Sequence, residues 1–132
     1  MKLPNTIIYP EQFNKSKPAR YDGVFDWSWT DGCFGETKIK PMDWDGVVER
    51  YGNFIVFETK NPGIEIPMGQ RITLEAAHKT GLFTIMLIWG KSCPENFEVW
   101  FPNGKIRKYE GIEKARQVVM KWFEYANASR KT

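Results

Sequence analysis

The chain has 132 residues, of which 42% are hydrophobic and 27% are charged, and its formal net charge is +3. These values are typical of one globular domain, and nine Phe, six Trp and five Tyr residues are enough to form a core, which excludes a chain disordered throughout. The longest apolar run, residues 82–90, is about half the ~20 residues that a membrane helix needs, so we expect no membrane association.

The amino-terminal residues lack the apolar core of a secretory signal. Cys33 and Cys93 lie far apart without the spacing of a metal site, so we interpret them as free thiols. Both observations favour a reducing compartment, and we expect a cytoplasmic location in a bacterium or in a phage-infected host cell.

Basic residues are concentrated at the carboxyl end. The last 28 residues contain eight basic and three acidic residues, which is about +5, while the first 104 contain 11 basic and 13 acidic residues, which is −2. This asymmetry fits a helix that faces phosphate groups and an acidic site elsewhere, although a solvated amphipathic helix would have the same composition.

The predicted elements begin with an extended arm over residues 1–20, with one helical turn near residues 11–15. The alternating pattern of residues 24–29 predicts a strand, and Asp31 and Gly32 predict a turn after it. Residues 33–43, which Gly35 and Pro41 interrupt, are predicted to be irregular.

Residues 45–60 form two β-rich runs on either side of a turn at residues 50–53, which predicts a hairpin. Residues 68–81 predict a helix that ends at Gly81, and a hydrophobic strand follows over residues 82–89.

A second hairpin, with its turn at residues 102–104, and a helix over residues 112–128 complete the chain. Six residues are predicted to share the apolar face of that helix: Ile112, Ala115, Val119, Trp122, Phe123 and Ala126. The order of elements indicates an α/β or α+β fold with a mixed sheet flanked by helices. We expect a single domain over residues 1–132, with the amino-terminal arm, a central core over residues 41–90, and the hairpin and helix over residues 97–129.

The first hairpin brings acidic residues together in either of two registers. If the loop is Tyr51 and Gly52, Asp45 lies directly opposite Glu58; if the loop slips by one residue, Asp45 faces Lys60 instead. Glu58 and Lys60 share one face because strand side chains alternate with period two.

Two carboxylates this close repel each other unless a cation lies between them. Oxygen ligands at this spacing suit Mg²⁺ or Mn²⁺, and an adjacent lysine can hold an attacking water or neutralise charge on a phosphate. The pattern therefore indicates a site that hydrolyses phosphodiesters.

The acid-x-Lys triplet has little specificity by itself, because the chain contains it twice. The first copy, with Glu36 and Lys38, has no strand before it and is interpreted as surface. The second, with Glu58 and Lys60, ends an apolar run and has an acid across the hairpin.

Residues 41–70 then resemble the PD-(D/E)xK nuclease superfamily, and most of all its small virus-type replication-repair nucleases and Holliday junction resolvase-like enzymes. The family pattern is an Asp on one strand, an acid-x-Lys on the next and a Gln at the start of the following helix, which correspond here to Asp45, Glu58, Lys60 and Gln70. The resemblance covers residues 41–90 and implies a restriction-endonuclease-like fold.

The resemblance also implies roles for these residues. Asp45, Glu58 and the main-chain carbonyl of Thr59 would bind the metal, Lys60 would position the water, and Gln70 would support the site. The sequence departs from the pattern because Asp43 competes with Asp45, and because the acid that many relatives carry on an upstream helix has no clear equivalent, which leaves Asp22, Asp26 and Glu36 open for that role.

Outside this core, Arg71, Lys105, Arg107 and Lys108 are the candidates for DNA phosphate contacts. The lone His78 is interpreted as a surface or capping residue, and no small-molecule cofactor is expected. Phe25, Trp27 and Trp29 are interpreted as a packing or interface face, and the resemblance to resolvases implies a homodimer.

The leading hypothesis is a metal-dependent DNA endonuclease that selects branched or flapped DNA. The alternative is a catalytically inactive protein of the same fold that binds DNA or protein, of phage origin. A third interpretation is a small structural or host-interaction protein whose aromatic face is the contact surface.

Overall fold

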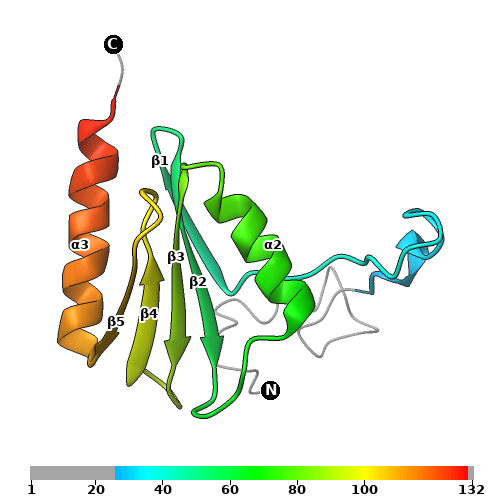
Figure 1. The fold of residues 1–132 in the computed structure, drawn as a ribbon, viewed down its shortest axis with the longest axis horizontal. Helices are drawn as coiled ribbons and strands as arrows, with labels where there is room; N and C mark the ends of the chain where they lie inside the picture. The colour runs from blue at the N-terminus through cyan, green and yellow to red at the C-terminus, as the bar shows by residue number, and fades with distance from the viewer. Residues whose placement is uncertain (1–25, 131–132) are drawn as a thin grey trace, which may run out of the picture. The chain divides into compact units, whose positions relative to one another are not determined.

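The computed structural model describes residues 26–130, and the chain divides into two compact units, Met1–Pro41 and Met42–Thr132. The predicted arm over residues 1–20 and its helical turn lie outside the described residues. The second unit contains a five-stranded sheet and two helices (Figure 1). The expectation of one domain over the whole chain stays a prediction.

The strand predicted over residues 24–29 is wrong for the residues that the structure describes. A short 3₁₀ helix, η2 (Ser28–Thr30), takes its place. The Asp26 carboxylate accepts the Ser28 N–H at 3.1 Å, and the Thr30 hydroxyl donates to the Trp27 carbonyl at 2.8 Å. These local side-chain hydrogen bonds compete with sheet pairing, and the alternating sequence pattern gives no sign of them.

The first hairpin has one of the two registers that the sequence allowed, the one in which Asp45 lies opposite Glu58. Strand β1 (Gly46–Arg50) pairs antiparallel with β2 (Asn53–Lys60), and Arg50 lies opposite Asn53. The two-residue loop, Tyr51 and Gly52, has positive φ values of 50° and 82°, as a tight turn that matches the twist of its strands requires.

Helix α2 (Met68–His78) connects β2 to strand β3 (Phe83–Trp89), which runs parallel to it. The helix ends at His78, before the predicted end at Gly81; Gly81 has a φ of +79° and its N–H donates to the His78 carbonyl at 3.1 Å. This crossover places the beginning of α2 near the end of β2.

Strands β4 (Asn96–Trp100) and β5 (Ile106–Glu110) form the second predicted hairpin and give the sheet the order β1-β2-β3-β4-β5. The predicted α+β fold, a mixed sheet flanked by helices with a carboxyl-terminal hairpin and helix, is confirmed. Among the described residues, no helix has the length and apolar character to cross a membrane.

The two helices cover opposite faces of the sheet, each over its own apolar cluster. Val56, Ile85 and Leu87 pack with Leu74 of α2, whereas the alternate strand residues pack with helix α3 (Ile112–Ala128). The buried stripe of α3 consists of Ala115, Val118, Trp122 and Ala126.

The predicted apolar face of α3 is therefore partly wrong. Ile112 and Phe123 are exposed, and Val118, which the pattern missed, is buried. The stripe that contacts the sheet is narrower than the apolar arc of the sequence, so the apolar residues at its margins remain in solvent.

Candidate functional site

Four sequence-predicted site residues lie together where β1 begins and β2 ends. Asp45 immediately precedes β1, and the hairpin register continues to place it opposite Glu58. Glu58 and Lys60 lie at the carboxyl end of β2, and Gln70 lies in the first turn of α2. The hairpin and the crossover helix together therefore bring residues separated by up to 25 positions into one cluster.

Glu58 is the centre of this cluster. Its side chain is 2% exposed, and its Oε1 accepts a hydrogen bond from Gln70 Nε2 at 2.9 Å. Lys60 Nζ lies 4.0 Å from the same oxygen. Burying an ionised carboxylate destabilises the folded protein unless it has partners of this kind. The positions of Gln70 and Lys60 therefore help to determine whether Glu58 is ionised or protonated.

Asp45 is fixed by the residue between Glu58 and Lys60. Its Oδ2 accepts hydrogen bonds from the Thr59 backbone N–H at 2.7 Å and from the Thr59 hydroxyl at 2.9 Å. Thr59 thus orients the carboxylate of Asp45 beside Glu58. The sequence predicted a role for the Thr59 carbonyl, which stays a prediction, and it missed the role of the hydroxyl.

The two carboxyl groups have pKa values that move apart. Burial and the negative charge of Asp45 together raise the pKa of Glu58 to about 7, and Lys60 and Gln70 oppose the rise. Burial alone would also raise the pKa of Asp45, but the hydrogen bonds from Thr59, with the help of Glu58 and Lys60, lower it below its ordinary value of 3.8. Near neutral pH the pair therefore holds one proton that is easily displaced.

The oxygen atoms of this cluster fit a hard divalent cation. Glu58 Oε2 and Gln70 Oε1 are both buried, and neither receives a hydrogen bond from a donor among the described residues. Together with Asp45 they make an oxygen-rich donor set of the kind that Mg²⁺ or Mn²⁺ binds. The described part of the chain contains no group of three or more His, Cys, Asp or Glu side chains that could hold a metal ion, and this cluster itself supplies two carboxylates.

The structure distinguishes Asp43 from Asp45 and describes two of the three candidates for an upstream acid. Asp43 precedes the hairpin and is exposed, whereas Asp45 makes the contacts with Thr59. Of the open candidates for an upstream acid, Asp26 binds the Ser28 N–H, Glu36 is exposed, and Asp22 lies outside the described residues. The first acid-x-Lys copy is exposed, as predicted.

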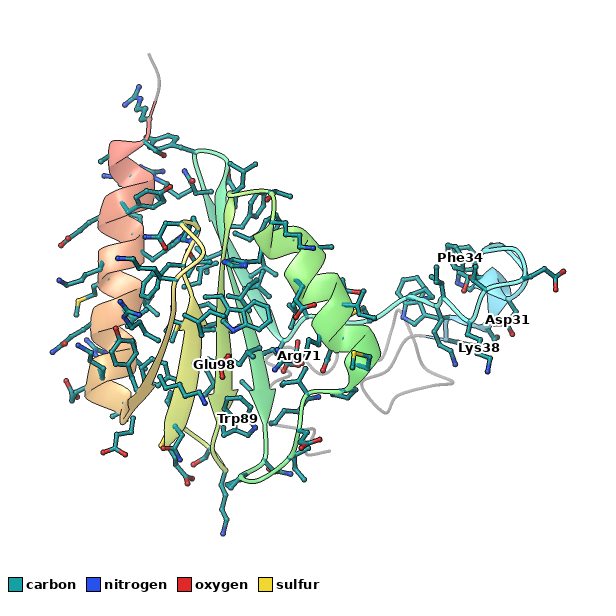
Figure 2. All side chains as sticks on the ribbon, viewed as in Figure 1. Asp31, Phe34, Lys38, Arg71, Trp89 and Glu98 are labelled. Carbon is teal, nitrogen blue, oxygen red and sulfur yellow. The ribbon has the colours of Figure 1, made fainter. Side chains whose placement is uncertain are left out.

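The four candidates for DNA contact do not share one surface. Arg71 follows Gln70 in α2, lies 3.8 Å from the Glu75 carboxylate and stacks over the Trp100 ring, with 5.4 Å to its centroid (Arg71 is labelled in Figure 2). Lys105 is exposed in the turn before β5. The pairing of Arg107 with Val99 and of Lys108 with Glu98 puts these two neighbours on opposite faces of the edge strand.

Two residues at the α2 face were missed by the sequence interpretation. Trp89 pairs with Lys60 across β2 and β3, and its indole N–H donates to the Ile64 carbonyl at 2.6 Å, which fixes the loop between β2 and α2. Glu98 accepts the Trp100 indole N–H at 2.8 Å (Trp89 and Glu98 are labelled in Figure 2). The two-residue period that puts Trp89 on the face of Leu87, and Glu98 on the face opposite Val99, was visible, but the parallel register that pairs Trp89 with Lys60 was not.

The other residues that the sequence analysis singled out are His78, the two cysteines and the aromatic residues near position 27. His78 Nε2 lies 2.6 Å from the Phe101 carbonyl, and its ring packs against Trp100, so it links α2 to the end of β4. Cys33 and Cys93 are free and exposed. Trp27 and Trp29 are exposed, with ring centroids 6.1 Å apart, and Phe25 lies outside the described residues.

Comparison of the chain with protein-family models, with curated proteins and with solved structures gave no significant match. The resemblance to PD-(D/E)xK nucleases therefore depends on the residues of this cluster alone and stays a prediction.

Proposed function

We propose that this protein is a divalent-metal-dependent deoxyribonuclease that hydrolyses phosphodiester bonds at the Asp45–Glu58 site. The observation that carries the proposal is the buried Glu58 carboxyl group, which adjoins Asp45, Lys60 and Gln70 at one end of the sheet. Burying a carboxyl group beside a second one destabilises the fold in the absence of a cation. A bound cation would offset this cost, so the arrangement supports a metal site.

Asp45 and Glu58 would hold Mg²⁺ or Mn²⁺, with Gln70 Oε1 and the Thr59 carbonyl as further oxygen donors. The metal, when bound, stabilises negative charge on the phosphate and lowers the pKa of water. Thr59 holds the Asp45 carboxylate in place through its N–H and hydroxyl. Gln70 keeps one oxygen of Glu58 engaged, so that the other remains available to a ligand.

Lys60 has a position suited to the substrate rather than to the core. Its side chain is 22% exposed, and its ammonium lies 4.0 Å from Glu58 Oε1. At this separation the ammonium can reorient toward a phosphate or a water while the protein stays folded. The first turn of α2 adds the partial positive charge of a helix amino terminus on the same side.

DNA is the proposed substrate because the carboxyl-terminal region is basic and because the family that the motif resembles cleaves DNA. Selectivity for branched or flapped DNA and a homodimeric state belong to the same proposal and rest on that resemblance, whereas the proposed cytoplasmic location rests on the two free cysteines. The alternative, an inactive protein that uses this fold to bind DNA or protein, is a distinct outcome of the experiment below.

The test is cleavage of linear, flapped and four-way DNA by the purified protein with Mg²⁺ or Mn²⁺. We expect cleavage that EDTA abolishes and that Glu58→Ala and Lys60→Ala each reduce by at least about 100-fold, since both residues act at the reacting phosphate. Circular dichroism would show that both variants remain folded.

The chain offers a matched control in its other acid-x-Lys triplet. Lys38→Ala removes from an exposed segment the same group that Lys60→Ala removes, and it is expected to cleave like the unchanged protein. Cleavage that survives Glu58→Ala would overturn the assignment. Absence of cleavage on every substrate, with calorimetry showing no divalent-metal binding, would favour the binding protein instead.

A further inference from the structure

Helix α3 crosses its face of the sheet obliquely and leaves a corner open. Its first residue follows directly after β5, whereas its last turn reaches the opposite edge, where Arg50 Nε donates to Asn127 Oδ1 at 2.9 Å and Asn53 Nδ2 donates to Ser129 Oγ at 2.6 Å. The helix therefore moves away from the end of the β4–β5 hairpin. A pocket of about 420 Å³ occupies the space between them.

This pocket has the size of a small-molecule site and aromatic walls. Phe101 and Tyr109 come from the β4–β5 hairpin, and Trp122 and Tyr125 come from α3. Trp122 is 6% exposed, and its indole N–H has no hydrogen-bond acceptor among the described residues. Aromatic walls of this kind bind flat rings by stacking, and an unpaired donor favours a ligand that carries acceptor atoms.

The charged groups of the pocket have one sign. Among the described residues that line it, the charged side chains are those of Lys114 and Lys121, which are both exposed and lie two helical turns apart on α3. Lys114 Nζ lies 4.8 Å from the centroid of the Tyr109 ring, so one lysine already joins the aromatic wall to the charged rim. Asn103 and Gln117 add amide groups at the same opening.

The pocket is separate from the Asp45–Glu58 site. Its floor and wall residues, Phe101, Tyr109 and Trp122, belong to the apolar cluster on the α3 face, whereas Glu58 is bonded to α2 on the other face. A ligand in the pocket would therefore leave the carboxylate pair accessible, and the inference does not depend on the activity proposed above.

We propose that this pocket binds a nucleotide, with the base between the aromatic side chains and the phosphate at Lys114 and Lys121. The flat ring, the acceptor atoms and the negative charge of a nucleotide correspond to the three features of the pocket: aromatic walls, amide and indole donors, and paired lysines. A free mononucleotide and one nucleotide of a single DNA strand share this chemistry, and the two sources can be distinguished by experiment.

The experiment follows the indole N–H resonances of ¹⁵N-labelled protein by NMR, with the Trp122 signal assigned from a Trp122→Phe variant. The probes are adenosine monophosphate, adenosine, ribose 5-phosphate and a short single-stranded oligodeoxythymidylate. We expect the monophosphate to shift the Trp122 resonance with saturation, and adenosine and ribose 5-phosphate each to bind more weakly, because each lacks half of the recognised chemistry. Tighter binding of the oligonucleotide than of the monophosphate would identify a DNA strand as the source, and the reverse order would identify a free nucleotide.

Variants of the rim make the test specific. Lys114→Gln combined with Lys121→Gln is expected to weaken binding of the monophosphate about tenfold, since two charge-assisted contacts to phosphate are removed from exposed positions that the fold does not need. Arg116→Gln removes a positive charge from the same helix outside this pocket and is expected to change little. The proposal would be overturned if no probe shifted the Trp122 resonance, or if Arg116→Gln weakened binding as much as the double variant.

Discussion

Gln70 donates its side-chain amide to Glu58 Oε1 at 2.9 Å and thereby joins the first turn of α2 to the end of β2. This hydrogen bond opposes the rise in the pKa of Glu58 that burial causes, and it leaves Glu58 Oε2 without a donor. The same contact therefore stabilises the carboxyl group and keeps one of its oxygens available.

Gln70→Ala would leave a buried carboxyl oxygen without its donor. We expect it to destabilise the protein by about 1–3 kcal/mol at pH 8, where Glu58 is mostly ionised, and to raise the pKa of Glu58 further. Chemical denaturation at pH 8 measures the effect, with Gln117→Ala on the exposed side of α3 as the control. Equal effects of the two substitutions would contradict the role of this hydrogen bond.

The raised pKa of Glu58 makes stability depend on pH in the absence of metal. Because its pKa is about 7 in the folded state and 4.5 ordinarily, its contribution to stability is full below about pH 4.5 and is lost as the pH rises through 7, by up to about 3 kcal/mol. Asp45 acts in the opposite direction: its lowered pKa contributes stability above its ordinary value of 3.8, which is lost as the pH falls through the folded-state value.

Unfolding curves in EDTA between pH 5 and 8 would measure this loss. We expect Glu58→Gln to remove most of the dependence, because the amide has no charge to bury, and we expect Mg²⁺ or Mn²⁺ to restore stability at pH 8 by binding the folded state. If the free energy of unfolding of the unchanged protein did not vary between pH 5 and 8, the raised pKa of buried Glu58 would be contradicted.

Asp45→Asn keeps an oxygen acceptor for Thr59 but removes the charge. We expect the fold to persist and the affinity for Mn²⁺ to fall at least about tenfold, because one of two carboxylates is lost. Isothermal titration calorimetry gives the comparison, and Asp43→Asn, which changes an exposed acid on the same approach to β1, is the matched control. A larger loss with Asp43→Asn would transfer the metal-binding role to that residue.

Gly90, which follows β3, has no room for a side chain. A Cβ atom there would overlap the Cys93 carbonyl, and the Gly90 N–H donates to the Lys60 carbonyl at 3.1 Å. We expect Gly90→Ala to destabilise the protein by more than about 1 kcal/mol, since backbone must move to relieve the overlap.

Gly69→Ala is the control for Gly90→Ala. Its Cβ meets nothing within 4 Å, and Gly69 lies inside α2, so we expect a gain of about 0.4–1 kcal/mol from reduced freedom of the unfolded chain. Thermal unfolding of the two variants should therefore show shifts of opposite sign, and a shared direction would count against this account of the two sites.

Much of the fold could be predicted because it depends on local patterns. The turn at Tyr51 and Gly52 fixes the first hairpin, and the two-residue period of the strands then places Glu58 and Lys60 on one face. The strand at residues 24–29 was predicted from the same kind of alternation, and it failed because Asp26 and Thr30 bind the local backbone instead.

The sequence by itself determined which acids could meet, because pairing within a hairpin follows from its turn. Only the tertiary structure decided that Glu58 is buried, that Gln70 reaches it from α2, and that Thr59 holds Asp45, since these depend on how the crossover helix packs against the sheet. The oblique path of α3 and the pocket beside Trp122 likewise follow from packing between segments that are distant in the sequence. The periodicity of the sequence does not predict such packing.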